Sequence, residues 1–178
     1  MKWKILKQEY LEKNDWIKLR KDCCETASGK RVEDYYVMEI QDVSCVVAMT
    51  KDKKILLVKE YKHGIQKEIL QLPCGYVDKG ELPLQTAQRE LLEETGYATK
   101  RWKSLGKCAG SPGRLTHYYH FFLAEDVEKV REPKLDELES VAHFIYSLEE
   151  AEKQLKKQEI DLITPTGLFL AKEYLQRK

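Results

Sequence analysis

The sequence predicts a mixed α/β or α+β domain on a mixed β-sheet, preceded by an extension of antiparallel strands. The 178 residues suffice for one domain with a sizeable core. Short apolar runs, separated by polar turns, interleave irregularly with stretches of helical periodicity. Hydrophobic residues make up 42% of the chain and charged residues 34%, the ordinary balance of a globular protein.

The first part of the chain is predicted to be mostly β-strand. Apolar runs begin at Trp3 and Trp16, and Ser28–Lys30 is typical of a turn before a third run. Further on, Cys45–Met49 and Ile55–Val58 are compact apolar runs separated by a polar turn. This pattern predicts two adjacent strands that are buried on at least one face.

The clearest helix is predicted over Pro83–Thr95. Proline suits its first turn, where a missing N–H costs nothing. Gly96 stands where a left-handed C-terminal cap is expected. Leu84, Ala87 and Leu91 follow the spacing of one apolar helix face.

The remaining segments complete the predicted domain. Strands are expected at Trp102–Leu105, Tyr118–Ala124 and Val141–Tyr146. Two C-terminal helices should cover Leu148–Lys157 and Pro165–Gln176, with Ser147 and Thr164 as candidate N-caps.

Composition excludes several classes of partner. The net charge is +1, from 31 basic and 30 acidic residues, whereas nucleic-acid binders usually carry a marked basic excess. No apolar run approaches the length of about 20 residues that a membrane-spanning helix needs, and the N-terminus lacks the apolar core of a signal peptide. We therefore expect a cytoplasmic protein that binds neither nucleic acid nor membrane. The five cysteines show no zinc-site spacing and are expected to be free thiols.

The predicted helix carries an unusual cluster of acids. Glu90 and Glu94 lie one turn apart on one face, and Glu93 lies beside them. Like charges at this spacing repel by roughly 0.2–0.5 kcal/mol, and carboxylates near a helix C-terminus oppose the macrodipole at about 0.3–1 kcal/mol each. A divalent cation reverses both penalties, and oxygen-only ligands favour Mg²⁺ or Mn²⁺ over zinc. The alternative is a solvated acidic face that Arg89 partly neutralises.

The flanking residues favour the cation. From Gly75 the pattern runs glycine, five residues, Glu81, seven residues, Arg89-Glu90-Leu91, one residue, Glu93-Glu94, one residue, Gly96-Tyr97. It matches in full the signature of the Nudix hydrolases, G-x5-E-x7-R-E-U-x-E-E-x-G-U, where U is a bulky apolar or aromatic residue. With seven fixed identities, the odds of a chance match are on the order of one in ten million. The chain thus resembles the Nudix hydrolase family.

The resemblance extends beyond the motif. Val58–Lys62 and Glu68–Gly75 are similar to the approach seen in ADP-ribose pyrophosphatase-like members. Pro112 lies 16 residues after Gly96, where a proline marks that subgroup. For residues 43–178 the resemblance implies a Nudix-type α/β/α sandwich on a mixed sheet.

Roles in the family carry over to the motif residues by position. The expected ligands of two or three Mg²⁺ ions, for which Mn²⁺ could substitute, are Glu90, Glu93, Glu94 and the backbone carbonyl of Cys74. Of these, Glu93 and Glu94 count as catalytic. The residues expected to support the ligands or shape the backbone are Gly75, Glu81, Arg89 and Gly96. The cations would neutralise a pyrophosphate and lower the pKa of an attacking water.

A carboxylate outside the helix should take the proton of that water. In the subgroup this base comes from a loop before the last strand, and the matching loop is Lys134–Ser140. Position favours Glu137, and Glu139 is the competitor. An acidic surface loop without a catalytic role is the other interpretation.

The resemblance also suggests substrate-binding residues, which are Tyr36, Lys62, Glu68, Pro112, Arg114 and His117. Tyr36 is expected near the nucleobase, although ordinary strand packing explains it equally well. Three positions depart from the family pattern. Cys74 stands where alanine is usual, and Lys62 replaces an arginine and loses its bidentate geometry. His117 falls where many members have a glutamate, which puts specificity for ADP-ribose in doubt.

The implied reaction is hydrolysis of the pyrophosphate bond of a nucleoside diphosphate linked to a sugar. ADP-ribose, cleaved to AMP and ribose 5-phosphate, is the first choice of substrate. The alternatives are another nucleotide sugar such as GDP-mannose or ADP-glucose, a dinucleotide, a damaged nucleotide, or binding without cleavage as a sensor. Residues 1–42 resemble the strand-rich extension that such enzymes exchange between subunits, so a homodimer is expected.

Overall fold

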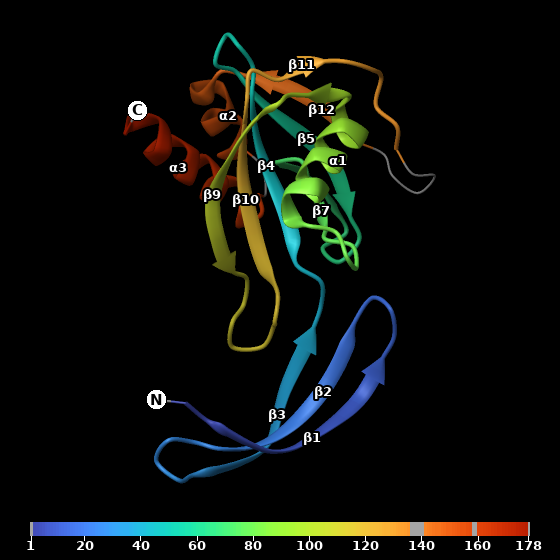
Figure 1. Cartoon of the computed structure of the whole chain (residues 1–178), viewed down its shortest axis with the longest axis vertical. Coiled ribbons are helices and arrows are strands. Elements are labelled where there is room, and N and C mark those ends of the chain that lie inside the picture. Colours follow the sequence, from blue (N-terminus) through green and yellow to red (C-terminus); the bar gives the residue numbers. More distant parts are fainter. Residues whose placement is uncertain (1, 136–140, 158–159, 178) are drawn as a thin grey trace. The chain divides into compact units, whose positions relative to one another are not determined.

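The computed structural model describes residues 2–135, 141–157 and 160–177 (Figure 1). Its contacts divide the chain into two compact units, Met1–Asp42 with Cys108–Tyr118, and Val43–Lys107 with Tyr119–Lys178. The segment Cys108–Tyr118 has most of its contacts with the N-terminal strands. Among the described residues, no helix is both long and apolar enough to span a membrane.

The smaller unit is a three-stranded antiparallel sheet in the order β1-β2-β3. Its strands are β1 (Lys4–Lys13), β2 (Lys18–Glu25) and β3 (Arg31–Glu39). Gly29, with a φ of 81°, makes the predicted turn between β2 and β3. Every residue of β1 is exposed in this chain, including the large side chains of Ile5 and Tyr10.

The larger unit is built on a mixed sheet with β12-β5-β4-β10-β9 as its main order. Its strands are β4 (Val43–Met49), β5 (Ile55–Lys62), β9 (Arg101–Ala109), β10 (Tyr118–Glu125) and β12 (Val141–Tyr146). Strands β4 and β10 are parallel, while β5 runs antiparallel to β4 and to β12. A separate short pairing joins β8 (Tyr97–Ala98) to β11 (Glu128–Lys129).

Strands β4 and β5 pair with each other at one end and with two different short strands farther along. These short strands position the motif. Strands β4 and β5 pair at Ala48–Met49. Farther along, β6 (Lys67–Gln71) pairs with β5 and β7 (Cys74–Tyr76) pairs with β4. A hydrogen bond of 2.9 Å from the Val46 N–H to the Pro73 carbonyl holds the link between β6 and β7.

Helices cover both faces of this sheet (Figure 1). On one face, α1 (Pro83–Thr95) buries Ala87 and Leu91 against Val46, Ala48, Leu56, Phe122 and Ala124. On the other face, α2 (Leu148–Leu155) and α3 (Ile163–Gln176) bury Ala151, Leu155, Leu168 and Ala171 against Val47, Leu57, Leu70 and Leu123. Neighbours along β4 point to opposite cores because strand side chains alternate. The predicted α/β/α sandwich on a mixed sheet is confirmed.

The helix ends follow the expected capping chemistry with one exception. Helix α1 has the predicted bounds, and Gly96 caps it with a φ of 75°. Ser147 caps α2 by accepting a hydrogen bond from the Glu150 N–H at 3.2 Å. The prediction that Thr164 caps α3 is wrong, because its hydroxyl is buried and accepts from the Leu72 N–H at 3.0 Å.

Candidate active site

The motif folds so that the start of β7 lies against α1. A side chain at Gly75 would place its Cβ 1.9 Å from Oε1 of Glu90, so Glu90 occupies the space that glycine leaves open. Ser44 on β4 donates a hydrogen bond of 2.7 Å to the Pro83 carbonyl and ties the first turn of the helix to the sheet. The close approach of β7 to α1 therefore depends on the absence of a side chain at residue 75.

Arg89 lies among the carboxylates of the motif. Its guanidinium contacts Glu81 at 3.0 Å, Glu90 at 2.7 Å and Glu93 at 3.4 Å. The hydrogen bond from Arg89 is the largest cause that lowers the pKa of Glu81, and the same bond raises the pKa of Arg89 itself. Thr86 adds a hydrogen bond of 2.7 Å to Glu81. These contacts fix Glu81 and Arg89 beside the helix acids, the place where a supporting role requires them.

Glu94 is the most deeply placed acid of the helix. The residue is 5% exposed, and its Oε2 atom is buried without a hydrogen-bond partner among the described residues. Burial, followed by the proximity of Cys74, raises the pKa of Glu94 well above its ordinary value. A buried carboxylate is costly unless a cation or hydrogen bonds compensate for its lost hydration. Glu94 thus has the properties of a ligand aimed at a cation.

A second polar group adjoins Glu94. Lys62 pairs with Glu60 at 2.6 Å, and the Gln71 amide donates to Glu60 at 3.1 Å. Burial is the largest single effect and opposes the charge of Lys62. The hydrogen bond to Glu60 and the nearby negative groups, Glu94 among them, together exceed it, so the pKa of Lys62 is raised. Lys62 is therefore a cation held near Glu94, and Glu60 is its direct partner. Glu68, also predicted to bind substrate, is exposed and pairs with Lys59 at 2.7 Å.

The donor atoms suit a hard divalent cation. Carboxylates of Glu90, Glu93 and Glu94 and the carbonyl of Cys74 are oxygen ligands of the kind that Mg²⁺ and Mn²⁺ prefer. These side chains do not surround a common point. Among the described residues, no group of three acidic, histidine or cysteine side chains is placed to hold a metal. Arg89 draws Glu90 and Glu93 toward itself. The buried Glu94 oxygen, which has no hydrogen-bond partner in the described part of the chain, is a group that a bound cation would compensate.

The loop predicted to supply the base has both ends at this site. The Lys134 N–H donates to the Glu93 carbonyl at 2.9 Å, and Val141, just after the loop, pairs with Glu60 of β5. Glu137 and Glu139 lie outside the described residues.

The other predicted substrate residues lie in the smaller unit. The loop containing Pro112 packs along β3, where the Met38 N–H donates to the Arg114 carbonyl at 2.8 Å. The Arg114 guanidinium stacks over the Tyr35 ring at 4.3 Å and donates to the Tyr36 carbonyl at 3.1 Å. The structure thereby brings Tyr36, Pro112 and Arg114 together. His117 is instead buried at 3% exposure, and burial lowers its pKa, so it is a poor candidate for direct contact with phosphate.

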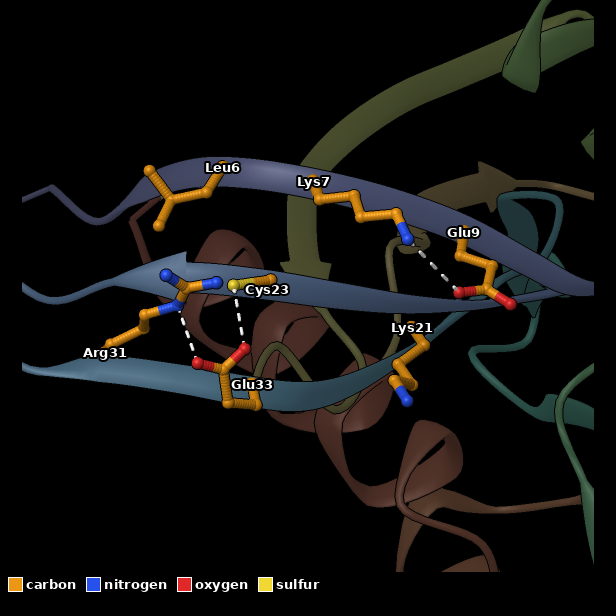
Figure 2. Close-up of a pocket in the computed structure, with 7 residues that line it drawn as sticks. All are labelled: Leu6, Lys7, Glu9, Lys21, Cys23, Arg31 and Glu33. Carbon is orange, nitrogen blue, oxygen red and sulfur yellow. Dashed lines mark hydrogen bonds and ion pairs between the residues drawn. The ribbon is translucent and has the colours of Figure 1, made fainter.

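A pocket of about 440 Å³ lies on the three-stranded sheet, and its lining residues are drawn in Figure 2. Its charged side chains pair locally, Arg31 with Glu33 at 2.6 Å and Lys7 with Glu9 at 3.9 Å. The Cys23 thiol donates to Glu33 at 3.4 Å. None of the residues predicted to bind metal or substrate lines this pocket, so we place the candidate active site at α1 and β7.

Three residues near the site were not identified from the sequence: Glu60, Gln71 and Asp161. Glu60 and Lys62 lie two residues apart at the end of an apolar strand. This spacing in the sequence indicates that the two side chains share one face of the strand. Asp161 has no comparable sequence signal. One of its oxygens accepts from the Thr164 N–H at 2.8 Å, and the other is buried without a partner in the described part of the chain.

Substitution of Gly75 by alanine should displace Glu90. The new Cβ would lie 1.9 Å from Oε1 and 2.2 Å from Cδ of Glu90, so the carboxylate must rotate away. We expect hydrolysis to fall roughly 10–100-fold, the loss typical when the support of a metal ligand is disturbed. Gly64→Ala is the matched control, because a Cβ there meets nothing within 4 Å. Equal kcat/KM for the two variants would contradict the assigned position of Glu90.

Two family models and several known proteins match this chain. Residues 38–165 match the model of the NUDIX domain, and residues 3–38 match that of the nucleoside diphosphate sugar hydrolase N-terminal domain. The chain is 34% identical over 177 residues to an ADP-ribose pyrophosphatase of Bacillus subtilis (strain 168), covering 98% of this chain and 93% of that protein. It is 33% identical over 174 residues to a methanol dehydrogenase activator of Bacillus methanolicus, covering 97% of this chain and 92% of that protein.

Solved structures include the same fold. The crystal structure of an ADP compounds hydrolase superposes with a TM-score of 0.84 at 22% identity, covering 99% of this chain and 95% of that one. A family match over most of the chain, and relatives above 30% identity over nearly its whole length, establish the relationship. The chain belongs to the Nudix family and is a Nudix hydrolase.

Proposed function

We propose that this Nudix hydrolase cleaves the pyrophosphate bond of ADP-ribose to give AMP and ribose 5-phosphate. The observation that carries the proposal is the 34% identity, over nearly the full length of both chains, to a protein named ADP-ribose pyrophosphatase. The N-terminal match to a nucleoside diphosphate sugar hydrolase domain supports a nucleotide sugar as the substrate class.

Nudix hydrolases generally use a divalent metal, and we propose Mg²⁺ here, with Mn²⁺ as a substitute, in two or three sites. Glu90, Glu93, Glu94 and the Cys74 carbonyl would hold it, and the bound cation would neutralise the pyrophosphate and acidify water. Arg89 and Glu81 would keep the ligands oriented. Lys62, paired with Glu60 at 2.6 Å, would add positive charge beside the phosphates.

The test is a substrate panel. Purified protein with Mg²⁺ should release AMP from ADP-ribose faster than it hydrolyses ADP-glucose, GDP-mannose, UDP-glucose or dinucleotides, measured as kcat/KM. A higher kcat/KM for another compound would transfer the proposal to that substrate. Tight binding of ADP-ribose without product release would make the protein a sensor.

Glu137 is the proposed general base. Its loop begins at Lys134, bonded to the Glu93 carbonyl, which favours delivery of a carboxylate to the metal-bound substrate. Glu137→Gln should lower kcat by about 10²–10⁴-fold, the range for a lost general base, and leave Mg²⁺ affinity nearly unchanged. Glu139→Gln is the matched control in the same loop. If the Glu139 variant shows the larger loss of kcat, the role passes to Glu139.

A homodimer is the proposed assembly. Strand β1 is exposed along its whole length in the single chain, and Trp16 is 76% exposed, which is unusual for large apolar side chains. A second copy that covers this sheet would bury them. Light scattering at micromolar concentration should give twice the chain mass of 20.9 kDa. A monomer at that concentration would remove the dimer from the proposal.

A further inference from the structure

Two cysteines face each other across strands β4 and β7, at the start of the motif. Cys45 and Cys74 are direct partners in the antiparallel register. The bond from the Val46 N–H to the Pro73 carbonyl joins the residues next to them, which makes Cys45 and Cys74 a non-hydrogen-bonded pair. In such pairs the Cα atoms lie about 4.5 Å apart and the side chains approach closely.

This spacing meets the geometry of a disulfide. Disulfides join residues whose Cα atoms lie roughly 4.4–6.8 Å apart, so a small shift of the backbone suffices to bring the sulfurs together. The two thiols already hydrogen-bond each other, and neither is in a disulfide. Cys23 and Cys24 on β2 are neighbours in sequence, and neither has a cysteine as its cross-strand partner.

Exposure defines the order of reaction. Cys45 is 0% exposed, whereas Cys74 is partly exposed. Because Cys74 is the less buried residue of the two, we take its sulfur as the one that a small oxidant attacks first.

We propose that Cys45 and Cys74 form a redox-sensitive pair that a peroxide closes to a cross-strand disulfide, lowering the hydrolase activity. The effect on activity rests on the proposed function. In the first step the Cys74 thiol takes one oxygen atom from hydrogen peroxide and becomes a sulfenic acid, and the rest of the peroxide leaves as water. In the second step the Cys45 sulfur attacks it, the S–S bond forms, and the sulfenic hydroxyl leaves with the Cys45 proton as a second water.

The consequence follows from the tight packing of β7. A disulfide shortens the contact between the sulfurs to about 2.05 Å and draws β7 toward β4. The carbonyl of Cys74 is a proposed metal ligand. The Glu90 carboxylate lies so close to Gly75 that a Cβ at residue 75 would not fit. A small shift of β7 therefore disturbs two ligands at once.

A peptide map tests the pair without reference to activity. The full chain is treated with hydrogen peroxide in the presence of EDTA, alkylated and digested without reductant. A cross-linked peptide that contains Cys45 and Cys74 should appear and should disappear with dithiothreitol. Cys45→Ala should abolish it, while Cys108→Ala, the matched control, should retain it. Recovery of Cys45 and Cys74 as alkylated thiols after treatment would overturn the proposal.

Two further readouts test the regulation. Activity should fall at least tenfold as the cross-link forms and return with dithiothreitol, whereas Cys45→Ala should keep its own untreated activity. The rise in Tm that Mg²⁺ produces should shrink by at least half in the cross-linked protein, whatever the substrate. If the untreated protein hydrolyses nothing in the panel, the proposed function fails, and this Tm readout alone decides the regulation. If Mg²⁺ raises the Tm of the cross-linked protein as much as that of the untreated protein, the proposed regulation is overturned.

Discussion

Glu94→Gln should reduce hydrolysis by roughly 10²–10³-fold or more, the range seen when one preorganised electrostatic group is removed. The residue is 5% exposed, and one of its oxygens has no hydrogen-bond partner among the described residues. Glutamine keeps the size of the side chain but cannot bind a hard cation as a charged ligand. The variant should therefore fold and lose its response to Mg²⁺.

Stability without metal should separate this loss from misfolding. The pKa of Glu94 is raised in the folded chain by burial and by Cys74. A carboxyl group whose folded pKa exceeds its unfolded value contributes its full stability below the unfolded pKa, about 4.3, and loses it as pH rises through the folded pKa. In EDTA the native protein should thus become less stable above that pH, while Glu94→Gln should lack this component.

The measurements are kcat/KM for ADP-ribose and Tm across pH, each with and without Mg²⁺. Glu149→Gln is the matched control, because Glu149 is an exposed helical glutamate on α2 paired with Lys153 at 2.7 Å. Wild-type activity in the Glu94 variant would remove α1 from the mechanism. Parallel pH curves of Tm in EDTA would show that Glu94 is ionised at little cost.

The local parts of this structure were predictable from the sequence. Residues Pro83 to Gly96 carry their own start, stop and periodicity, and the helix forms with those bounds. The order of burial among its acids depends on the sheet. Ala87 and Leu91 set the buried stripe, and Glu94 follows Leu91 by three residues onto that side.

Contacts between distant segments were not predictable. The pairing of Met38 with Leu115 joins a loop to a strand about 77 residues earlier, and no pattern among neighbouring residues predicts it. The contact between Cys45 and Cys74 depends likewise on the register of β4 with β7. A turn type or a helix cap is encoded in a few neighbouring residues, whereas a register is decided by the whole packed sheet.

Arg89→Gln should lower both the stability of the protein and its activity. Side-chain exposure is 31% for Arg89 and 14% for Glu90, so the pairs among them are only partly screened by solvent. Removal of the guanidinium leaves Glu81 and Glu90 without their cation, and we expect a loss of about 1–3 kcal/mol in the free energy of unfolding. Activity should fall roughly 10–100-fold, the cost of losing a partner that orients a metal ligand.

Arg89→Lys distinguishes charge from geometry. An ammonium keeps the charge, but it cannot span Glu81 at 3.0 Å and Glu90 at 2.7 Å with the fixed fork of a guanidinium. The lysine variant should therefore recover much of the stability and little of the activity, measured as Tm, kcat/KM and Mg²⁺ affinity. Arg101→Gln, which removes a 59% exposed arginine on β9, should change none of these. Full activity in the lysine variant would show that Arg89 acts through its charge alone, because the orientation of Glu90 would then not depend on the guanidinium.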